Sequence, residues 1–267
     1  MARRTRLDSE LVRRGLATSR REAQRAIDAG AVKVGGMPAA KAAALVDTDE
    51  PITISEPAER FVSRGGRKLD GVLARWDIPV AGRTWLDAGA STGGFTDRLL
   101  QGGASSVLAV DVGYGQLDWR LRNDTRVVVL ERVNVRSLAP EDLPWPPEGV
   151  VADLSFISLR LVLPALVRVA QDDADFLLLV KPQSEVGRGS VPRGGVVRDP
   201  QLWTQAIETV VLAGVASGLA LVGAAPSEIP GPAGNREFFL HLRSAAYPSV
   251  PDIGDAVVEA VTEAAGD

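Results

Sequence analysis

The residues best suited to chemistry form a glycine-rich turn within residues 85–95. An apolar run ends at Asp87, and G-A-S-T-G-G follows over residues 89–94 before a helical stretch. Glycine has no side chain, so a bound nucleoside can approach this backbone closely, and N–H groups at the start of the helix face the ligand. About twenty residues later, a second apolar run ends in Asp111, where a carboxylate can bind ribose hydroxyls. The spacing predicts a site for a nucleoside cofactor.

The glycine-rich turn at 89–94 distinguishes between S-adenosylmethionine and a dinucleotide as the bound cofactor. A dinucleotide fingerprint has the spacing G-x-G-x-x-G, which is absent here, and a carboxylate at the entrance does not suit a pyrophosphate. Asp87 suits a ligand that carries an ammonium or sulfonium group, and S-adenosylmethionine carries both. The turn therefore favours a methyltransferase. A dinucleotide enzyme and a glycine turn without a ligand stay open as alternatives.

The predicted cofactor site draws on several strand ends. Asp87 and the turn would surround the methionine part, and Asp111 would hold the ribose. Asn134 follows the apolar run 127–130, where it could contact the adenine edge or serve only as a turn residue. The full predicted set is Asp87, Gly89, Ser91, Thr92, Gly93, Gly94, Asp111, Asn134 and Asp153.

An aspartate and a lysine end two further apolar runs. Asp153 ends the run that begins at Val150, and Lys181 follows four apolar residues, where an unpaired ammonium group would be costly. The carboxyl ends of strands in an open α/β sheet converge on the ligand crevice, so both residues are candidates for catalysis. The alternatives are a turn cap through Ser155 for Asp153 and a solvated strand end for Lys181.

Alternating strands and helices would position these groups. This order is typical of an α/β, Rossmann-like, mostly parallel sheet with helices on both faces. We assign residues 65–244 to this domain and residues 245–267 to an acidic tail, either disordered or forming one loose helix. The expected strands are 84–88, 107–111, 127–130, 150–153, 176–180, 220–224 and 237–242, and the expected helices include 94–101, 158–170 and 201–216.

Composition excludes several kinds of site. The 267 residues, 45% of them hydrophobic, suit one full domain and a small one. The chain has no cysteine, which excludes disulfides, thiol catalysis and thiolate metal sites. Its one histidine, His241, lies in an alternating run and is expected to face its neighbours in a sheet. No apolar run approaches the ~20 residues that span a bilayer, and no signal peptide is evident, so we expect a cytoplasmic protein without a metal or a membrane partner.

The charge is distributed unevenly. The net charge is −4, yet residues 1–68 carry 14 Lys and Arg against nine Asp and Glu. Such density on a short unit indicates a surface that binds a nucleic-acid phosphate backbone, although a solvated helical surface is the alternative. The arginines concerned are Arg3, Arg4, Arg6, Arg13, Arg14, Arg20, Arg21 and Arg25.

The basic segment reads as a small α+β domain. Leu7, Leu11 and Leu16 recur at helical spacing, and a capping box of Ser19 and Glu22 begins a second helix that stops at Gly30. Two short strands follow. The pattern L-D-x-x-L-V-x-R-G-L at 7–16 and S-R-x-x-A-x-x-x-I-x-x-G-x-V-x-V-x-G at 19–36 resembles the S4 domain, which implies binding of structured RNA by shape and phosphate contacts. We assign residues 1–58 to it and residues 59–64 to a linker.

The rest of the chain resembles the TlyA family, whose members carry haemolysin A-like names and are S-adenosylmethionine-dependent ribosomal RNA 2′-O-methyltransferases. Together with the S4-like segment, the resemblance covers nearly the whole chain, and it implies a cytidine target in rRNA of the small subunit, the large subunit or both. The matching segments are S-R-G-G-x-K-L at 63–69, L-D-A-G-A-S-T-G-G-F-T at 86–96, D-V-G-Y-G-Q-L at 111–117, L-R-N-D at 121–124, A-D-L-S-F-I-S-L at 152–159, L-V-K-P-Q at 179–183 and G-N-R-E-F-F-L at 234–240.

The resemblance also implies a catalytic set of Lys68, Asp153, Lys181 and Glu237. Transfer of a methyl group to a ribose hydroxyl is an in-line displacement by a weak nucleophile, which must be aligned and helped toward deprotonation. Lys181 would lie nearest the hydroxyl, and the two carboxylates would fix the ammonium groups of Lys181 and Lys68.

The chain departs from the family pattern at three positions. Ser184 stands where a phenylalanine is usual, near the expected entry of the target base, and Glu59 and Phe61 replace an arginine and a tryptophan of the linker. These changes leave the catalytic set intact. Two rival functions are an inactive rRNA-binding protein, against which the intact set argues, and a pore-forming haemolysin, which no membrane-spanning run supports.

Overall fold

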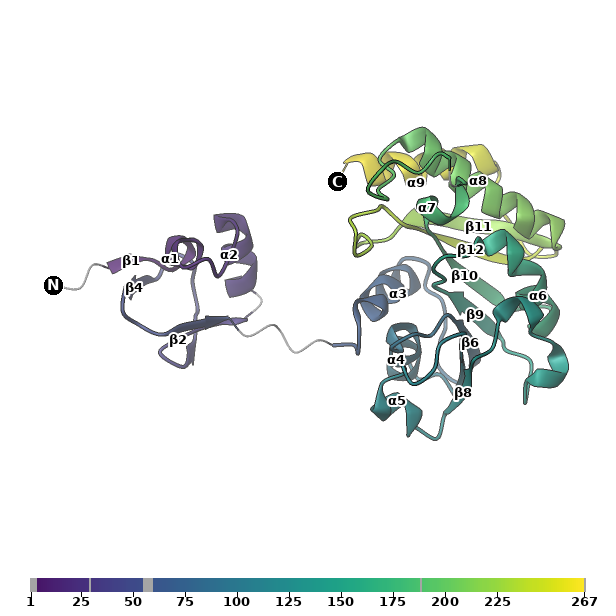
Figure 1. Ribbon diagram of the computed structural model, residues 1–267, viewed down its shortest axis with the longest axis horizontal. Coiled ribbons are helices and arrows are strands. Elements are labelled where there is room, and N and C mark those ends of the chain that lie inside the picture. The colour runs from purple at the N-terminus through teal and green to yellow at the C-terminus, as the bar shows by residue number, and fades with distance from the viewer. Residues whose placement is uncertain (1–3, 29, 55–59, 188, 267) are drawn as a thin grey trace. The chain divides into compact units, whose positions relative to one another are not determined.

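The computed structural model describes residues 4–28, 30–54, 60–187 and 189–266. They fall into two compact units, Met1–Arg60 and Phe61–Asp267 (Figure 1). Arg3 and Glu59, named in the sequence analysis, lie outside the described residues.

The first unit contains the two predicted helices, α1 (Leu7–Arg13) and α2 (Arg20–Asp28). Leu7, Leu11, Ala23 and Ile27 are buried together because they occupy one face of each helix. Only half of the expected capping box forms: Ser19 Oγ accepts the Glu22 N–H at 3.2 Å, but the Glu22 carboxylate accepts the N–H of Thr18. The strands are β1 (Arg4–Arg6), which pairs with β4 (Leu45–Asp47), and β2 (Val32–Val34), which lies between β3 (Met37–Pro38) and β5 (Ile52–Ile54).

The second unit is built on one seven-stranded sheet of order β11-β12-β10-β9-β6-β7-β8. The five strands from β10 to β8 are parallel, and β12 runs antiparallel to both of its neighbours. All the predicted strands are present within two residues of their expected ends. They are β6 (Thr84–Ala88), β7 (Ser106–Asp111), β8 (Val127–Glu131), β9 (Gly149–Ala152), β10 (Asp175–Val180), β11 (Leu219–Pro226) and β12 (Phe238–Ser244).

Helices cover both faces of this sheet, as predicted. Trp85 packs on the side of α3 (Arg64–Arg75) and α4 (Gly94–Gln101), whereas its neighbour Leu86 packs on the side of α8 (Pro200–Ala216). Successive strand residues point to opposite faces, so each strand contributes to both cores. A shorter helix, α5 (Trp119–Arg122), adds Leu121 to the first of them.

Two expected features beyond the sheet are corrected. The helix expected over 158–170 is divided into a 3₁₀ turn, Leu159–Leu161, and α6 (Leu163–Val169), because Pro164 lacks an N–H group and sits in the first turn of α6. The C-terminal stretch is neither disordered nor loose over Ile253–Gly266, which form α9. Val257, Ala260, Val261 and Ala264 are buried and join the core beside α8 and β11.

The predicted linker 59–64 also needs correction, because from Phe61 onward it belongs to the second unit. Phe61 is buried, and a Cβ on Gly66 would lie 2.3 Å from its ring, so glycine is required there. Val62 N–H donates to Asp97 at 2.8 Å, and α3 begins at Arg64.

His241 lies on β12 as expected and is buried, with Nε2 2.8 Å from a carboxylate oxygen of Asp175. Within the described part of the chain, no helix is long and apolar enough to span a membrane.

Candidate active site

The polar candidates meet at one edge of the seven-stranded sheet. Asp111 ends β7, Asp153 follows β9 and Lys181 follows β10, and parallel strands bring these ends together. Glu237 precedes β12 and reaches the same edge, because antiparallel pairing sets Phe238 opposite Val180. The sheet thus gathers groups that are far apart in the sequence.

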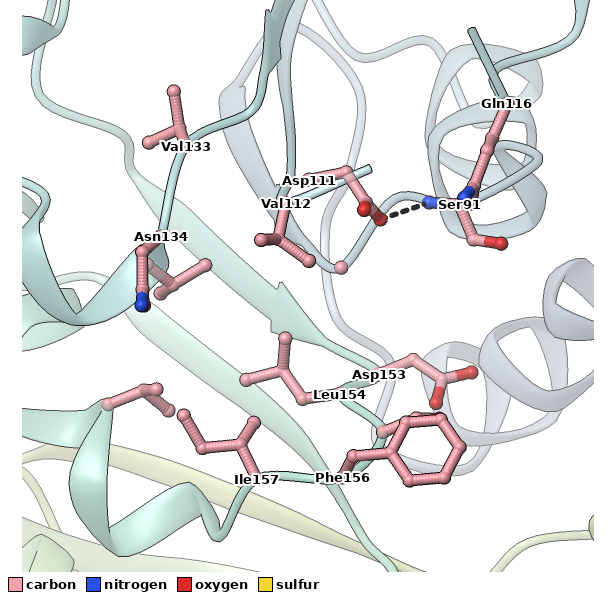
Figure 2. A pocket seen from close by; sticks show the side chains of 14 residues that line it. Ser91, Asp111, Val112, Gln116, Val133, Asn134, Asp153, Leu154, Phe156 and Ile157 are labelled. Atoms are coloured by element: carbon pink, nitrogen blue, oxygen red, sulfur yellow. Dashed lines mark hydrogen bonds between the residues drawn. The ribbon is translucent and has the colours of Figure 1, made fainter. Parts of the chain in front are cut away.

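A cleft lies along this edge. Two cavities, of about 440 Å³ and about 340 Å³, share Gly89, Ser91, Asp153 and Ser155 in their linings. Figure 2 shows Asp111 and Ser91 on one side of the larger cavity and the segment from Asp153 to Ile157 on the other. Their combined size suits a nucleoside-sized ligand with a second group beside it.

Some residues of the glycine-rich turn line the cleft, whereas Gly93 packs against neighbouring side chains. Gly89 has φ +86°, and a Cβ there would lie 2.6 Å from the Asp153 carbonyl oxygen, so only glycine fits. Ser91, Thr92 and Gly94 line the smaller cavity. Gly93 is not among the residues that line either cavity: with φ +98°, it lies against Leu117 and Leu121. Its contact with a ligand stays a prediction.

Asp87 is buried at the floor of the smaller cavity. Its Oδ2 accepts hydrogen bonds from the N–H and hydroxyl of Thr96 at 2.9 and 2.7 Å. Oδ1 has no hydrogen-bond partner in the described residues. Burial raises the pKa of Asp87 to about 7, against the opposing effect of the Thr96 hydrogen bonds. A buried, half-satisfied carboxyl group is suited to a cationic ligand.

Asp111 and Asn134 line the larger cavity as predicted. The Asp111 carboxylate accepts the Ser91 N–H at 2.8 Å and the Gly113 N–H at 2.6 Å, and each oxygen keeps a lone pair for a ligand hydroxyl. Asn134 Oδ1 accepts the Arg136 N–H at 3.1 Å and caps a short 3₁₀ turn, so its predicted turn role is confirmed. Its contact with a base stays a prediction.

Both lysines of the candidate catalytic set are paired with carboxylates. Lys68 Nζ lies 2.5 Å from Glu237 Oε2, and both side chains are nearly inaccessible. Lys181 Nζ lies 2.6 Å from Asp153 Oδ1, at an angle that makes an ion pair rather than an aligned hydrogen bond. Lys181 also donates to Ser155 Oγ at 2.9 Å. At 11% side-chain exposure, Lys181 is not a solvated strand end.

Three of these four residues face the same space. Lys68, Asp153 and Lys181 line the smaller cavity with Asp87. Glu237 is not among the residues that line this cavity. It forms an ion pair with Lys68 through Oε2, and its other carboxylate oxygen lies close to Gly231. The arrangement places two ammonium groups beside a cavity whose floor holds a carboxyl group.

Sequence reasoning missed part of the cleft wall. Leu154, Ser155, Phe156 and Ile157 line the larger cavity, and Ser155 is the second partner of Lys181. These residues directly follow Asp153 at a strand end. That position in the sequence could have indicated that they line the ligand cleft. Ser184, expected near the base entry, lies on α7 (Pro182–Glu185) and is not among the residues that line either cavity.

The arginines of the first unit differ in their availability. Arg6 and Arg20 share Asp8, and Arg13 and Arg14 share the buried Glu10. Hydrogen bonds from Arg13 and Arg14 lower the pKa of Glu10 to about 2.

Arg14 also donates to the carbonyl oxygens of Thr48 and Glu50 at 2.8 Å, so it stabilises the fold rather than facing outward as expected. Arg4 is exposed and pairs with Asp47. Arg21 and Arg25 are exposed and make no ion pair with any described residue.

Comparisons with known proteins agree with this geometry. A family model described as FtsJ-like methyltransferase matches residues 61–244, and one described as S4 domain matches residues 5–52. The chain is 54% identical, over 98% of its length and 99% of the relative's, to a Mycobacterium tuberculosis protein named 16S/23S rRNA (cytidine-2′-O)-methyltransferase TlyA.

Two further relatives carry haemolysin names. Hemolysin A of Brachyspira hyodysenteriae is 37% identical over 89% of this chain and 99% of its own. A solved structure from Streptococcus thermophilus is 38% identical, covers 99% of this chain and 96% of its own, and superposes with a TM-score of 0.75. The similarity therefore extends over both units in sequence and in fold.

Proposed function

The chain belongs to the FtsJ-like methyltransferase family, and on that premise we propose that it transfers a methyl group from S-adenosylmethionine to a ribose 2′-hydroxyl of ribosomal RNA. One observation carries the proposal: two carboxylate-paired lysines border a cavity that also contains Asp87. The name of the Mycobacterium tuberculosis relative supports a cytidine target in rRNA of the small subunit, the large subunit or both. A ribosomal substrate would place the protein in the cytoplasm.

The cleft fits S-adenosylmethionine by the chemistry of its donors. The unpartnered Oδ1 of Asp87 would receive the cationic methionine end, and Asp111 would accept ribose hydroxyls. Gly89 leaves the space that a side chain would fill, and Asn134 would contact the adenine edge. When bound, this cofactor supplies an electrophilic methyl group on a sulfonium sulfur.

Lys181 is the group that we assign to the ribose hydroxyl. Its ammonium would donate a hydrogen bond to the 2′-oxygen, direct a lone pair at the methyl group and stabilise the negative charge that develops as the O–H proton passes to solvent water. Asp153 and Ser155 hold Nζ in place at 2.6 and 2.9 Å. The energetic gain comes from alignment, because both reacting groups are held before reaction.

Lys68 and Glu237 form the second charged pair. Lys68 lines the cavity and would supply a further positive charge beside the reacting oxygen, while Glu237 holds its ammonium group from behind. Burial of a lysine without such a partner would be costly. The pair thus keeps a positive charge in a water-poor site.

The function is tested by methyl transfer from labelled S-adenosylmethionine to purified small and large ribosomal subunits, with nuclease mapping of the product. We expect label on a ribose 2′-oxygen. Cofactor binding without labelling of either subunit would favour an inactive RNA-binding protein. Leakage of lipid vesicles at concentrations that give no methylation would favour the haemolysin alternative.

Cofactor affinity is expected to depend on pH through Asp87. Its pKa of about 7 means that the carboxyl group is mostly protonated at pH 6 and mostly ionised at pH 8. A cationic ligand favours the ionised form, so S-adenosylmethionine should bind roughly tenfold more tightly at pH 8 than at pH 6. Calorimetric titration at several pH values measures this. In Asp87→Asn, the affinity for S-adenosylmethionine should be weak and independent of pH between pH 6 and pH 8. An affinity that is independent of pH in the wild type would rule out the role assigned to Asp87.

RNA affinity is expected to depend on Arg21 and Arg25 of α2, which are exposed and form no ion pair within the described part of the chain. Arg21→Ala and Arg25→Ala should each weaken binding to ribosomal subunits and lower the salt slope of log K by roughly 1. Binding is measured by filter retention at several salt concentrations. Arg75→Ala, which removes one positive charge from α3, is the matched control and should leave the slope unchanged. Equal slopes in all variants would remove the proposed role of α2.

A further inference from the structure

The segment from Leu154 to Ser158 forms one wall of the proposed cofactor cavity. It directly follows Asp153, and four of its residues line the larger cavity (Figure 2). Phe156 adopts φ +65° and is fully exposed, so its own packing does not hold the backbone in this unfavourable conformation. The shape of this wall must therefore be imposed by contacts elsewhere.

Two residues hold the wall, and both lie in the stretch that follows β10. Lys181 donates to Ser155 Oγ at 2.9 Å. Four residues later, Glu185 ends α7 and accepts the Ser158 hydroxyl through Oε2 and the Leu159 N–H, at 2.9 Å, through Oε1. The segment that carries Lys181 thus fixes both the middle and the end of the wall.

Glu185 is costly to bury and has no part in the proposed methyl transfer. It is 6% exposed, and no lysine or arginine forms an ion pair with it among the described residues. Burial raises the pKa of Glu185, and the hydrogen bonds from Ser158 and Leu159 oppose the shift. Arg160 Nε donates to Ser158 Oγ at 3.2 Å and so orients the hydroxyl toward Glu185. An apolar residue at this position would leave the Leu159 N–H without its acceptor.

We propose that Glu185 is a positioning residue that fixes the 154–158 wall against the strand end that carries Lys181. The inference rests on the proposed function, since Lys181 is the group assigned to the ribose hydroxyl. Glu185 acts through Ser155 and Asp153: when the end of the wall is fixed, these two partners of Lys181 keep their places. Misplacement of a reacting group by about 1 Å can lower a rate about 100-fold. Glu185 is therefore expected to affect turnover although it contacts neither the RNA nor S-adenosylmethionine.

Three variants test the role of Glu185. Glu185→Ala removes both acceptors and should lower kcat on ribosomal subunits about 10- to 100-fold. Glu185→Gln keeps an acceptor for Leu159 and a polar group for Ser158, and should restore kcat to within about threefold of the wild type. Glu148→Ala is the matched control, because Glu148 also accepts one N–H and one hydroxyl, both from Thr84, at the opposite end of the strands. Its kcat should stay within about twofold of the wild type.

A second readout does not depend on activity. Hydrogen exchange of the segment 154–160 should accelerate at least about tenfold in Glu185→Ala and return toward the wild-type rate in Glu185→Gln. Unchanged exchange and unchanged kcat in Glu185→Ala, or an equal loss of kcat in Glu148→Ala, would overturn the proposal. Failure of the wild type to methylate any subunit would refute the proposed function, while the exchange data would still show whether Glu185 fixes the wall.

Discussion

Lys181→Ala should lower kcat for methyl transfer by about 10³-fold, at the upper end of what loss of one charge-stabilising donor costs. The variant removes the group that we place at the ribose oxygen, and it changes none of the residues that we assign to S-adenosylmethionine, which are Asp87, Gly89, Asp111 and Asn134. The affinity for S-adenosylmethionine should therefore change by less than about threefold. Single-turnover kinetics with saturating subunits and calorimetric titration of the cofactor give the two values.

Two companion variants make the Lys181 result specific. Ser155→Ala removes one of the two partners of Lys181 and should lower kcat by about tenfold, because Asp153 still holds the ammonium group. Lys33→Ala removes an exposed lysine from β2 in the first unit and should leave kcat unchanged under saturation. Turnover of Lys181→Ala near the wild-type rate would refute the catalytic assignment.

Glu237→Ala should lower the free energy of unfolding of the second unit by about 3–5 kcal/mol, because it leaves the Lys68 ammonium buried without its partner. Replacing both residues, in Lys68→Met with Glu237→Gln, should recover most of this loss since no unpaired charge remains. The double variant should still be inactive. A stable but inactive protein would separate the fold from the chemistry of the pair.

The measurement is helped by the distribution of tryptophan. All five tryptophans lie beyond residue 75, so their fluorescence during denaturant unfolding reports on the second unit alone. The exposed pair of Arg75 and Glu263 is the matched control, and removing either partner should cost less than about 1 kcal/mol. Additive effects of Lys68→Met and Glu237→Gln in the double-mutant cycle would contradict a coupled buried pair.

Local patterns predicted most of the second unit. Apolar runs of strand length, separated by helical spacing, predicted all seven strands. For the five parallel strands the physical reason is that a strand buried on both faces needs a continuous run of apolar residues. A polar residue at the end of such a run marks the ligand edge of the sheet, which is how Asp111, Asp153 and Lys181 were found. The resemblance to the TlyA family added Lys68 and Glu237, for which local sequence gave little signal.

Other features depended on contacts between distant segments. The requirement for glycine at Gly93 comes from Leu117 and Leu121, which pack where its side chain would be. Arg14 is half-buried because it binds Glu10 and the carbonyl oxygens of Thr48 and Glu50, which are distant in the sequence. The packing of α9 depends on an apolar surface that α8 and β11 present together.

By itself, the sequence determined the class of fold, the glycine turn, the strand ends that carry the acids and the basic character of the first unit. These are local properties, since hydrophobic period and backbone freedom are encoded within a few neighbouring residues. The family resemblance implied that two carboxylates hold Lys68 and Lys181, but only the tertiary structure decided which carboxylate pairs with which lysine and how the other charges are paired. The antiparallel course of β12 between β10 and β11 brings Glu237 to Lys68, and the fold of α7 brings Glu185 to Ser158. Partners 169 and 27 residues apart meet through strand order and helix packing, which no local pattern specifies.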